Sequence, residues 1–167
     1  MTQQKNWNKT SYGSYSFSIN GVERGSLNVT NHRKEAEARI DGKNFKIKCR
    51  GFLKLFLEVL DDAGNTVLKI TQDSWLASRW EMLHNFKRYR LVLRNFPLAQ
   101  YVVTENGKEI LSYGLKTQKF KPYLHIESET TERDLLMDFV LWFLYAPIVH
   151  ESTATGLPRY TSAIAAV

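Results

Sequence analysis

The stretch Leu135-Leu136-Met137-Asp138-Phe139-Val140-Leu141-Trp142-Phe143-Leu144-Tyr145-Ala146-Pro147-Ile148-Val149 decides the fold of this chain. Every residue in it except Asp138 is apolar or aromatic, although the mean hydropathy of the whole chain is −0.36. Read as a helix, the stretch has no polar face. A helix that is apolar on every side is enclosed either by protein or by lipid.

Length and composition favour enclosure by protein. At about 1.5 Å of rise per residue the stretch spans roughly 22 Å, which is short of a hydrocarbon core of about 30 Å. Asp138 would lie inside that core, and Pro147 would break the helix near its end. We therefore predict a buried helix over about residues 131–146, with Thr131 as its N-cap. The residues expected to form its packed core are Leu135, Leu136, Phe139, Val140, Trp142 and Phe143.

The rest of the chain must supply the cover for this helix. Its 167 residues are enough for one domain with a sizeable core. The formal net charge of +6 and a pI near 9.4 allow an anionic partner without requiring one. The single cysteine, Cys49, permits no disulfide within the chain, and the polar N-terminus does not resemble a signal peptide. These features predict a cytoplasmic protein, peripheral at a membrane if it meets one.

Period-two alternation dominates residues 14–129 and predicts a series of antiparallel strands. The dipeptides Asn20-Gly21, Asp41-Gly42 and Asn106-Gly107 are typical of type I′ hairpin turns, and residues 61–65 form a longer hairpin loop. Residues 73–85 fit either a helix or an extended segment. The strands expected from this pattern lie near 14–19, 26–30, 35–40, 43–49, 53–60, 66–71, 87–94, 100–105, 108–114 and 120–128.

Together, the strands and the helix predict a mainly β protein. A closed antiparallel β-barrel of about 10–12 strands that encloses the hydrophobic C-terminal helix covers the helix on all sides and removes exposed strand edges. We expect an N-terminal segment over residues 1–13, one barrel domain with its central helix over 14–150, and a C-terminal tail over 151–167.

Three sequence features resemble the tubby C-terminal-like superfamily, which includes LURP-one-related proteins and phospholipid scramblases. Residues 59–68 are similar to its strand, D-x-x-G turn and strand; Ser74-Trp75 with Arg79-Trp80 is similar to a serine and Arg-Trp pair; and residues 123–149 resemble its closing strand and helix. The resemblance implies a twelve-stranded barrel threaded by a hydrophobic helix. The cysteine-rich and proline-rich segments of scramblases are absent from this sequence. Neither lipid scrambling nor phosphoinositide binding can therefore be assigned to particular residues.

Two rows of cations are the best candidates for a binding site. Cations that alternate along a strand project from one face and can hold phosphates or lipid headgroups together. The alternative is an ordinary solvated strand face. The rows are Lys46, Lys48 and Arg50 on one strand and Arg88, Arg90 and Arg94 on another.

No motif for catalysis, a metal or another cofactor stands out. The pairs His125–Glu127 and His150–Glu151 lack further ligands at a recognisable spacing, so we predict no metal site. Trp75, Trp80 and Trp142 are expected to pack in the core. Cys49 alternates with Phe45 and Ile47 and is likewise expected to be a core residue rather than a catalytic thiol.

The sequence therefore favours a non-enzymatic binding module that docks on anionic lipid headgroups or on another protein. The alternatives are a calycin-like carrier of a small hydrophobic ligand, with its helix packed outside the barrel, a membrane-associated scramblase-like protein, or a protein anchored in the membrane by residues 135–149. The basic residues have too few interleaved aromatic residues to indicate nucleic-acid binding.

Overall fold

The structure is a computed structural model that describes residues 4–30, 34–50, 56–72, 78–94, 98–119, 121–129 and 134–154. It contains twelve strands that follow one another as an antiparallel meander, and then one helix, α1. The strands are β1 (Lys5–Ser11), β2 (Ser14–Ile19), β3 (Val22–Thr30), β4 (Glu35–Ile40), β5 (Lys43–Arg50), β6 (Phe56–Asp61), β7 (Thr66–Gln72), β8 (Arg79–His84), β9 (Lys87–Arg94), β10 (Gln100–Glu105), β11 (Lys108–Gln118) and β12 (Lys121–Ser128). The helix α1 covers Leu136–Ala154.

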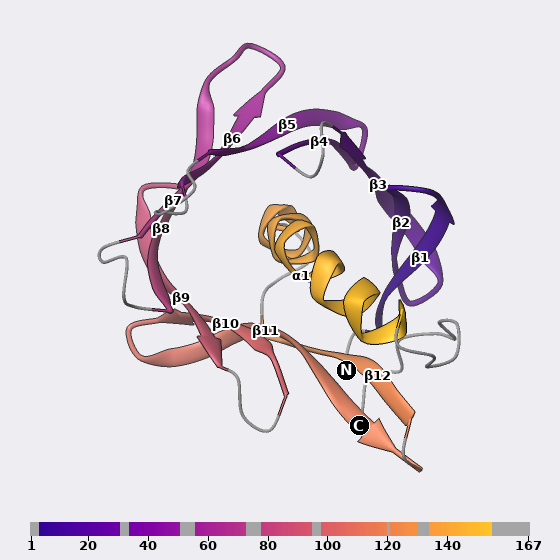
Figure 1. The fold of residues 1–167 in the computed structure, drawn as a ribbon. Coiled ribbons are helices and arrows are strands. Elements are labelled where there is room, and N and C mark those ends of the chain that lie inside the picture. The colour runs from indigo at the N-terminus through magenta and orange to yellow at the C-terminus, as the bar shows by residue number, and fades with distance from the viewer. Residues whose placement is uncertain are drawn as a thin grey trace.

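The strands curve into a nearly closed barrel around α1, which confirms the predicted fold class (Figure 1). Among the described residues, backbone pairing runs from β1 to β12 without returning to β1. Side chains join the two end strands instead: Lys5 Nζ donates to Ser128 Oγ at 2.8 Å. The carrier alternative required a helix packed outside the barrel. The helix α1 instead occupies the interior. None of the described helices is long and apolar enough to cross a membrane.

Burial of α1 follows from its composition. All six residues predicted to form its packed core are buried. Trp142 stacks on Trp7 of β1 with ring centroids 5.3 Å apart, and Phe139 meets Phe17 of β2 edge-on at 5.5 Å. Gly25 on β3 makes room for the helix, because a Cβ there would lie 2.9 Å from the Phe139 ring and 2.1 Å from the Arg39 carbonyl oxygen.

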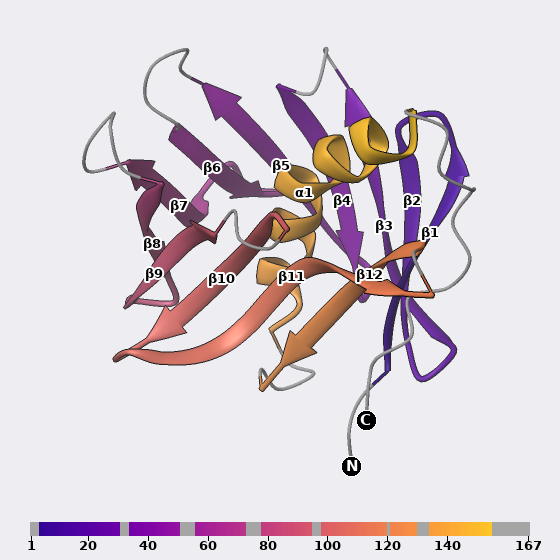
Figure 2. The same cartoon turned by 60° about the horizontal axis from the view of Figure 1, so that its bottom comes forward.

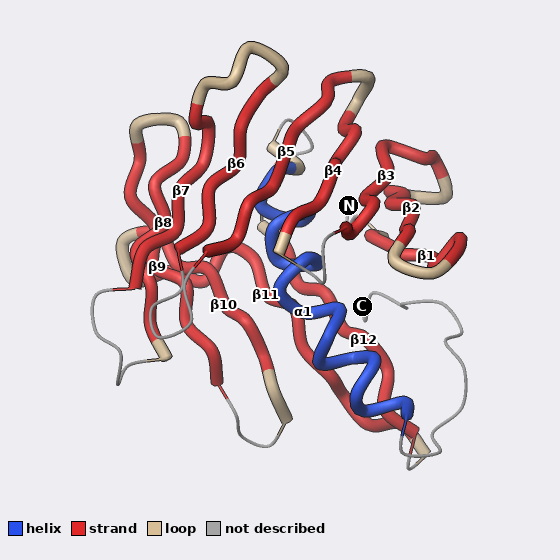
Figure 3. The backbone as a smooth tube through the Cα atoms, turned by 45° about the horizontal axis from the view of Figure 1, so that its top comes forward, coloured by secondary structure: helices blue, strands red, loops and turns tan. Residues whose placement is uncertain are grey.

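The meander gives the barrel two different ends. Every odd-numbered strand runs toward one end and every even-numbered strand runs back (Figure 2). Tight turns join even strands to odd ones at the end where α1 begins (Figure 3). The three predicted type I′ turns are confirmed at this end, since both central residues of each have positive φ.

Two local expectations differ from the structure, and one alternative that the sequence leaves open is decided by it. Residues 1–13 are expected to lie outside the barrel, yet Lys5–Ser11 form β1. Its two buried positions are Lys5 and Trp7, and a lysine at a buried position hides the alternation. The ambiguous segment contains β8, an extended strand, and its residues 73–77 lie outside the described chain. The helix begins at Leu136 and continues through Pro147 to Ala154. Proline disfavours the continuation of a helix, but Val149 beyond it is buried, and this packing stabilises the last turns of α1. Thr131 lies outside the described residues.

Candidate binding surfaces

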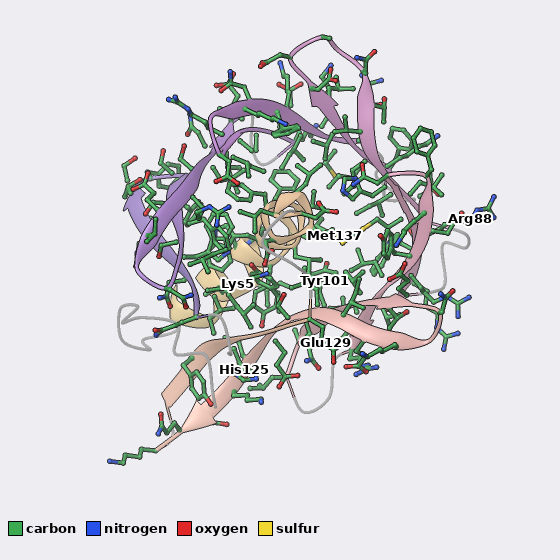
Figure 4. The ribbon with its side chains drawn as sticks, turned by 180° about the vertical axis from the view of Figure 1, so that it is seen from behind. Lys5, Arg88, Tyr101, His125, Glu129 and Met137 are labelled. Carbon is green, nitrogen blue, oxygen red and sulfur yellow. The ribbon has the colours of Figure 1, made fainter. Side chains whose placement is uncertain are left out.

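The two predicted rows of cations do not form one strip. Lys46, Lys48 and Arg50 lie on β5, and Arg88, Arg90 and Arg94 lie on β9. Strands β6, β7 and β8 separate the rows in the sheet. Figure 4 shows Arg88 projecting away from the barrel wall. The rows are therefore two distinct patches on the outer wall.

Carboxylates on neighbouring strands also face the cations of each row and compensate part of their charge. Lys48 lies directly across from Glu35 on β4 and from Glu58 on β6. Arg88 Nε lies 3.5 Å from Glu81, and Arg94 donates to Glu109 at 2.5 Å. Opposite charges facing each other across strands stabilise a solvated sheet modestly. Most of both rows is therefore a mixed-charge wall rather than a continuous cationic surface.

Unpaired cations gather instead at the end of the barrel where odd strands finish and even strands begin. We call this surface the cationic end. All of its cations are exposed, and within the described chain none has an ion-pair partner. The cationic end consists of Lys9, Lys34, Arg50, Arg79 and Lys119.

Backbone contacts bring cations on neighbouring strands together at this end. The Lys34 carbonyl accepts a hydrogen bond from the backbone N–H of Cys49 at 2.7 Å, which places Lys34 beside Arg50. Near the β1–β2 turn, Lys9 Nζ lies 5.9 Å from the centre of the exposed Tyr12 ring. Exposed cations on neighbouring strands favour binding of an anion.

The opposite end of the barrel carries carboxylates near its tight turns, and we call it the acidic end. Several of these carboxylates are engaged locally. Arg24 donates two hydrogen bonds to Asp41 at 2.7 and 2.9 Å, and hydrogen bonding to Arg24 contributes most to lowering the pKa of Asp41. Asp61 accepts from the backbone N–H groups of Ala63 and Asn65, and hydrogen bonds from Asn65 hold the pKa of Asp61 low. The carboxylates of the acidic end are Glu23, Asp41, Asp61, Asp62, Glu105 and Glu129.

A shallow groove of about 400 Å³ crosses the outer wall near the acidic end. Its lining is mainly polar and carries both signs of charge. Glu37 and Arg39 come from β4, while Asp62 also lines the groove and accepts a weak hydrogen bond from Asn44 at 3.4 Å. Nothing in this lining selects one class of ligand.

His125 and Glu127, which the sequence places two positions apart, are in contact, but their surroundings do not suit a metal. Glu127 Oε1 lies 2.6 Å from His125 Nε2, and Lys116 Nζ lies 2.7 Å from the same nitrogen. An ammonium group at that distance would repel a cation. The hydrogen bond from His125 is the main factor that lowers the pKa of Glu127. No group of three or more possible metal-ligating side chains occurs among the described residues, and the side chains of His150 and Glu151 lie outside them.

A buried polar cluster lies where side chains join β1 to β12, and no local sequence pattern indicates it. Lys5 Nζ donates to Asp138 Oδ2 at 2.7 Å, and Tyr113 OH donates to Asp138 Oδ1 at 2.8 Å. The Trp7 indole N–H in turn donates to Tyr113 OH at 3.0 Å. Burial raises the pKa of Tyr113 well above its ordinary value. The cluster ties β1, β11 and α1 together, and its enclosure points to a structural role.

Cys49 is partly buried, and burial raises the pKa of its thiol, which disfavours the thiolate that a nucleophile requires. Trp80 and Trp142 are buried, as predicted, and Trp75 lies outside the described residues.

Fold and surface together define a helix-filled antiparallel β-barrel. Its cationic end carries exposed cations without ion-pair partners among the described residues, and its acidic end carries carboxylates of which three are paired with Arg24, Lys87 and Lys108. No protein-family model matches the chain. Neither a curated protein nor a solved structure matches it.

Proposed function

We propose that this protein is a non-enzymatic binding module that docks on an anionic lipid surface through the cationic end of its barrel. The main support for this proposal is the set of exposed cations at the cationic end of the barrel, none of which has an ion-pair partner among the described residues. Cations elsewhere on the wall face carboxylates, as Lys48 and Arg88 do.

The overall charge arrangement supports an end-on orientation. With the cationic end against a bilayer, the acidic end is directed away from the negative headgroups. An exposed tyrosine next to a lysine, as at Tyr12 and Lys9, suits the headgroup region, where aromatic rings and cations are both favoured. The resemblance to the tubby C-terminal-like superfamily adds weight to a role at membranes. With α1 filling the barrel, a binding function is best sought on the outer surface.

Vesicle co-sedimentation tests this proposal. Wild type should bind vesicles of phosphatidylcholine with phosphatidylserine at low salt, fail to bind phosphatidylcholine alone, and lose binding as salt shortens the range of electrostatic attraction. The variant Lys34→Glu/Arg50→Glu/Arg79→Glu should bind on the order of 100-fold more weakly, since each basic residue near the membrane contributes about 1 kcal/mol.

A matched variant reverses the same number of charges on the wall: Lys46→Glu/Arg88→Glu/Arg90→Glu. We expect this variant to retain most of the binding. Equal loss in both variants would show that net charge rather than the cationic end controls binding. Absence of binding to phosphatidylserine vesicles at low salt would exclude lipid docking and leave an acidic protein surface as the partner to test.

A further inference from the structure

In the turn between β8 and β9, a phenylalanine, Phe86, has a positive φ angle, which is unfavourable for this residue. His84 pairs with Lys87, so Asn85 and Phe86 form a two-residue hairpin loop, and their φ angles are 50° and 60°. This is the pattern of a type I′ turn. Phe86 occupies the position that glycine takes in the three other turns of this kind, as Gly21, Gly42 and Gly107.

Phenylalanine is a poor residue for this position. A side chain with a Cβ is disfavoured in the left-handed region, and a bulky aromatic residue there is an outlier. The Phe86 side chain is fully exposed, so burial in the barrel does not offset the cost. Residues held in unfavourable conformations tend to occur at functional sites.

The surroundings of Phe86 are electrically compensated. Lys87 Nζ lies 3.1 Å from Glu105, Arg88 Nε lies 3.5 Å from Glu81, and His84 Nε2 lies 2.9 Å from Asp134. Leu83, on the outer face of the same hairpin, is also partly exposed. Among the described residues, the two cations that follow Phe86 in the chain are therefore paired, and the tip presents an exposed apolar ring.

We propose that Phe86 is an anchor residue that inserts into an apolar pocket of a partner protein. Aromatic side chains that enter such pockets dominate the affinity of many protein interfaces. A bilayer is the less favoured occupant, because the cations beside Phe86 are paired and the acidic end would face the headgroups. Since the proposed lipid surface lies at the other end, the barrel can engage both at once. The module would then link a membrane to a protein.

The conformational part of the proposal is tested with Phe86→Gly. Glycine restores the favourable residue for a type I′ turn, so the ratio of folded to unfolded protein should rise about 5- to 30-fold in urea unfolding. Unchanged or lower stability would show that Phe86 is not kept at a cost to folding and would overturn the proposal.

The binding part uses the photo-crosslinker p-benzoylphenylalanine at position 86 in extracts of the source cells, with the same probe at the exposed Val22 as a control. Capture alone is not support. The protein captured at position 86 is purified, and its Kd is measured by calorimetry for wild type, Phe86→Gly, Phe86→Trp and Val22→Ala.

The proposal requires at least a tenfold loss of affinity in Phe86→Gly, retention in Phe86→Trp and Val22→Ala, and little dependence on salt. Because Phe86→Gly should be the more stable protein, lost affinity cannot result from unfolding. Equal affinity of wild type and Phe86→Gly overturns the proposal, as does the absence of capture specific to position 86. A fluorophore at position 86 that shifts to the blue with phosphatidylcholine vesicles would assign the tip to a bilayer and also overturn it.

Discussion

At the scale of residues, Lys5 and Asp138 form an ion pair whose burial costs both side chains their hydration. Their side chains are 1 % and 0 % exposed, so both charges lose nearly all contact with water. Burial raises the pKa of Asp138, while the charge and hydrogen bond of Lys5 and the hydroxyl of Tyr113 act in the opposite direction. Such a pair contributes little net stability, yet loss of one partner leaves a buried charge uncompensated.

Lys5→Met should therefore destabilise the protein by about 3–5 kcal/mol. The double variant Lys5→Met/Asp138→Leu should recover most of that loss, because it removes both charges and keeps the volume apolar. Urea unfolding of the single and double variants gives the coupling energy. If the double variant is as unstable as the two single variants added together, the pair does not act as a unit.

The sequence could not have predicted this pair. In the sequence, Asp138 indicates only that the apolar stretch does not span a membrane, and Lys5 lies in a segment that is expected to stand apart from the barrel. The two residues are separated by 133 positions, and no local pattern connects them. Pairing becomes visible only when the closure of the barrel brings β1 next to the start of α1.

At the scale of elements, His84 joins the end of β8 to the segment that leads into α1. Its Nδ1 faces the Val67 carbonyl oxygen at 2.8 Å, and its Nε2 faces both oxygens of Asp134 at 2.9 Å. Both ring nitrogens thus have acceptors, an arrangement that suits the protonated imidazole. Burial lowers the pKa of His84, but the hydrogen bonds and the charge of Asp134 outweigh it, and the pKa is raised above 6.5.

This raised pKa predicts a dependence of stability on pH. The folded state holds the proton more tightly than the unfolded state, so the stabilisation is complete below the unfolded pKa of about 6.5 and is lost as pH rises through the folded pKa. As pH rises above about 6.5, the free energy of unfolding should fall more in wild type than in His84→Gln or Asp134→Asn. Parallel pH profiles for wild type and both variants would contradict the role of this contact.

Local patterns predicted most elements because each hairpin has its own turn signal and period. They failed where tertiary packing prevails over local preference, as in α1 beyond Pro147. They also failed at the β8–β9 turn, since Asn85-Phe86 lacks the glycine that marks the other type I′ turns.

For the whole molecule, the sequence revealed which residues face outward but not which ones face each other. The rows on β5 and β9 looked cationic because their partners on other strands are distant in sequence. Register places Glu35 and Glu58 beside Lys48 and thereby compensates much of the first row. The cationic end was hidden for the same reason: its residues come from five separate places in the chain and meet only at one end of the barrel.

The barrel and the helix should also fold as one unit. The inward faces of the strands pack on α1, and its buried Phe139 and Trp142 contact aromatic rings of β1 and β2. A chain ending after Asp134 would expose this apolar lining to water, and each large side chain that loses its cover forfeits roughly 1.5–3 kcal/mol. A few such losses exceed the total stability of a typical domain, about 5–15 kcal/mol.

We therefore expect the chain truncated after Asp134 to show no cooperative unfolding transition and to lose its near-ultraviolet circular dichroism. A chain truncated after Ala154 keeps every described strand and the helix, and it should unfold cooperatively. This comparison separates loss of the helix from loss of chain length. If the chain ending after Asp134 is soluble and unfolds cooperatively, the strands can form a core without α1. The helix would then fill the barrel without being required for its folding.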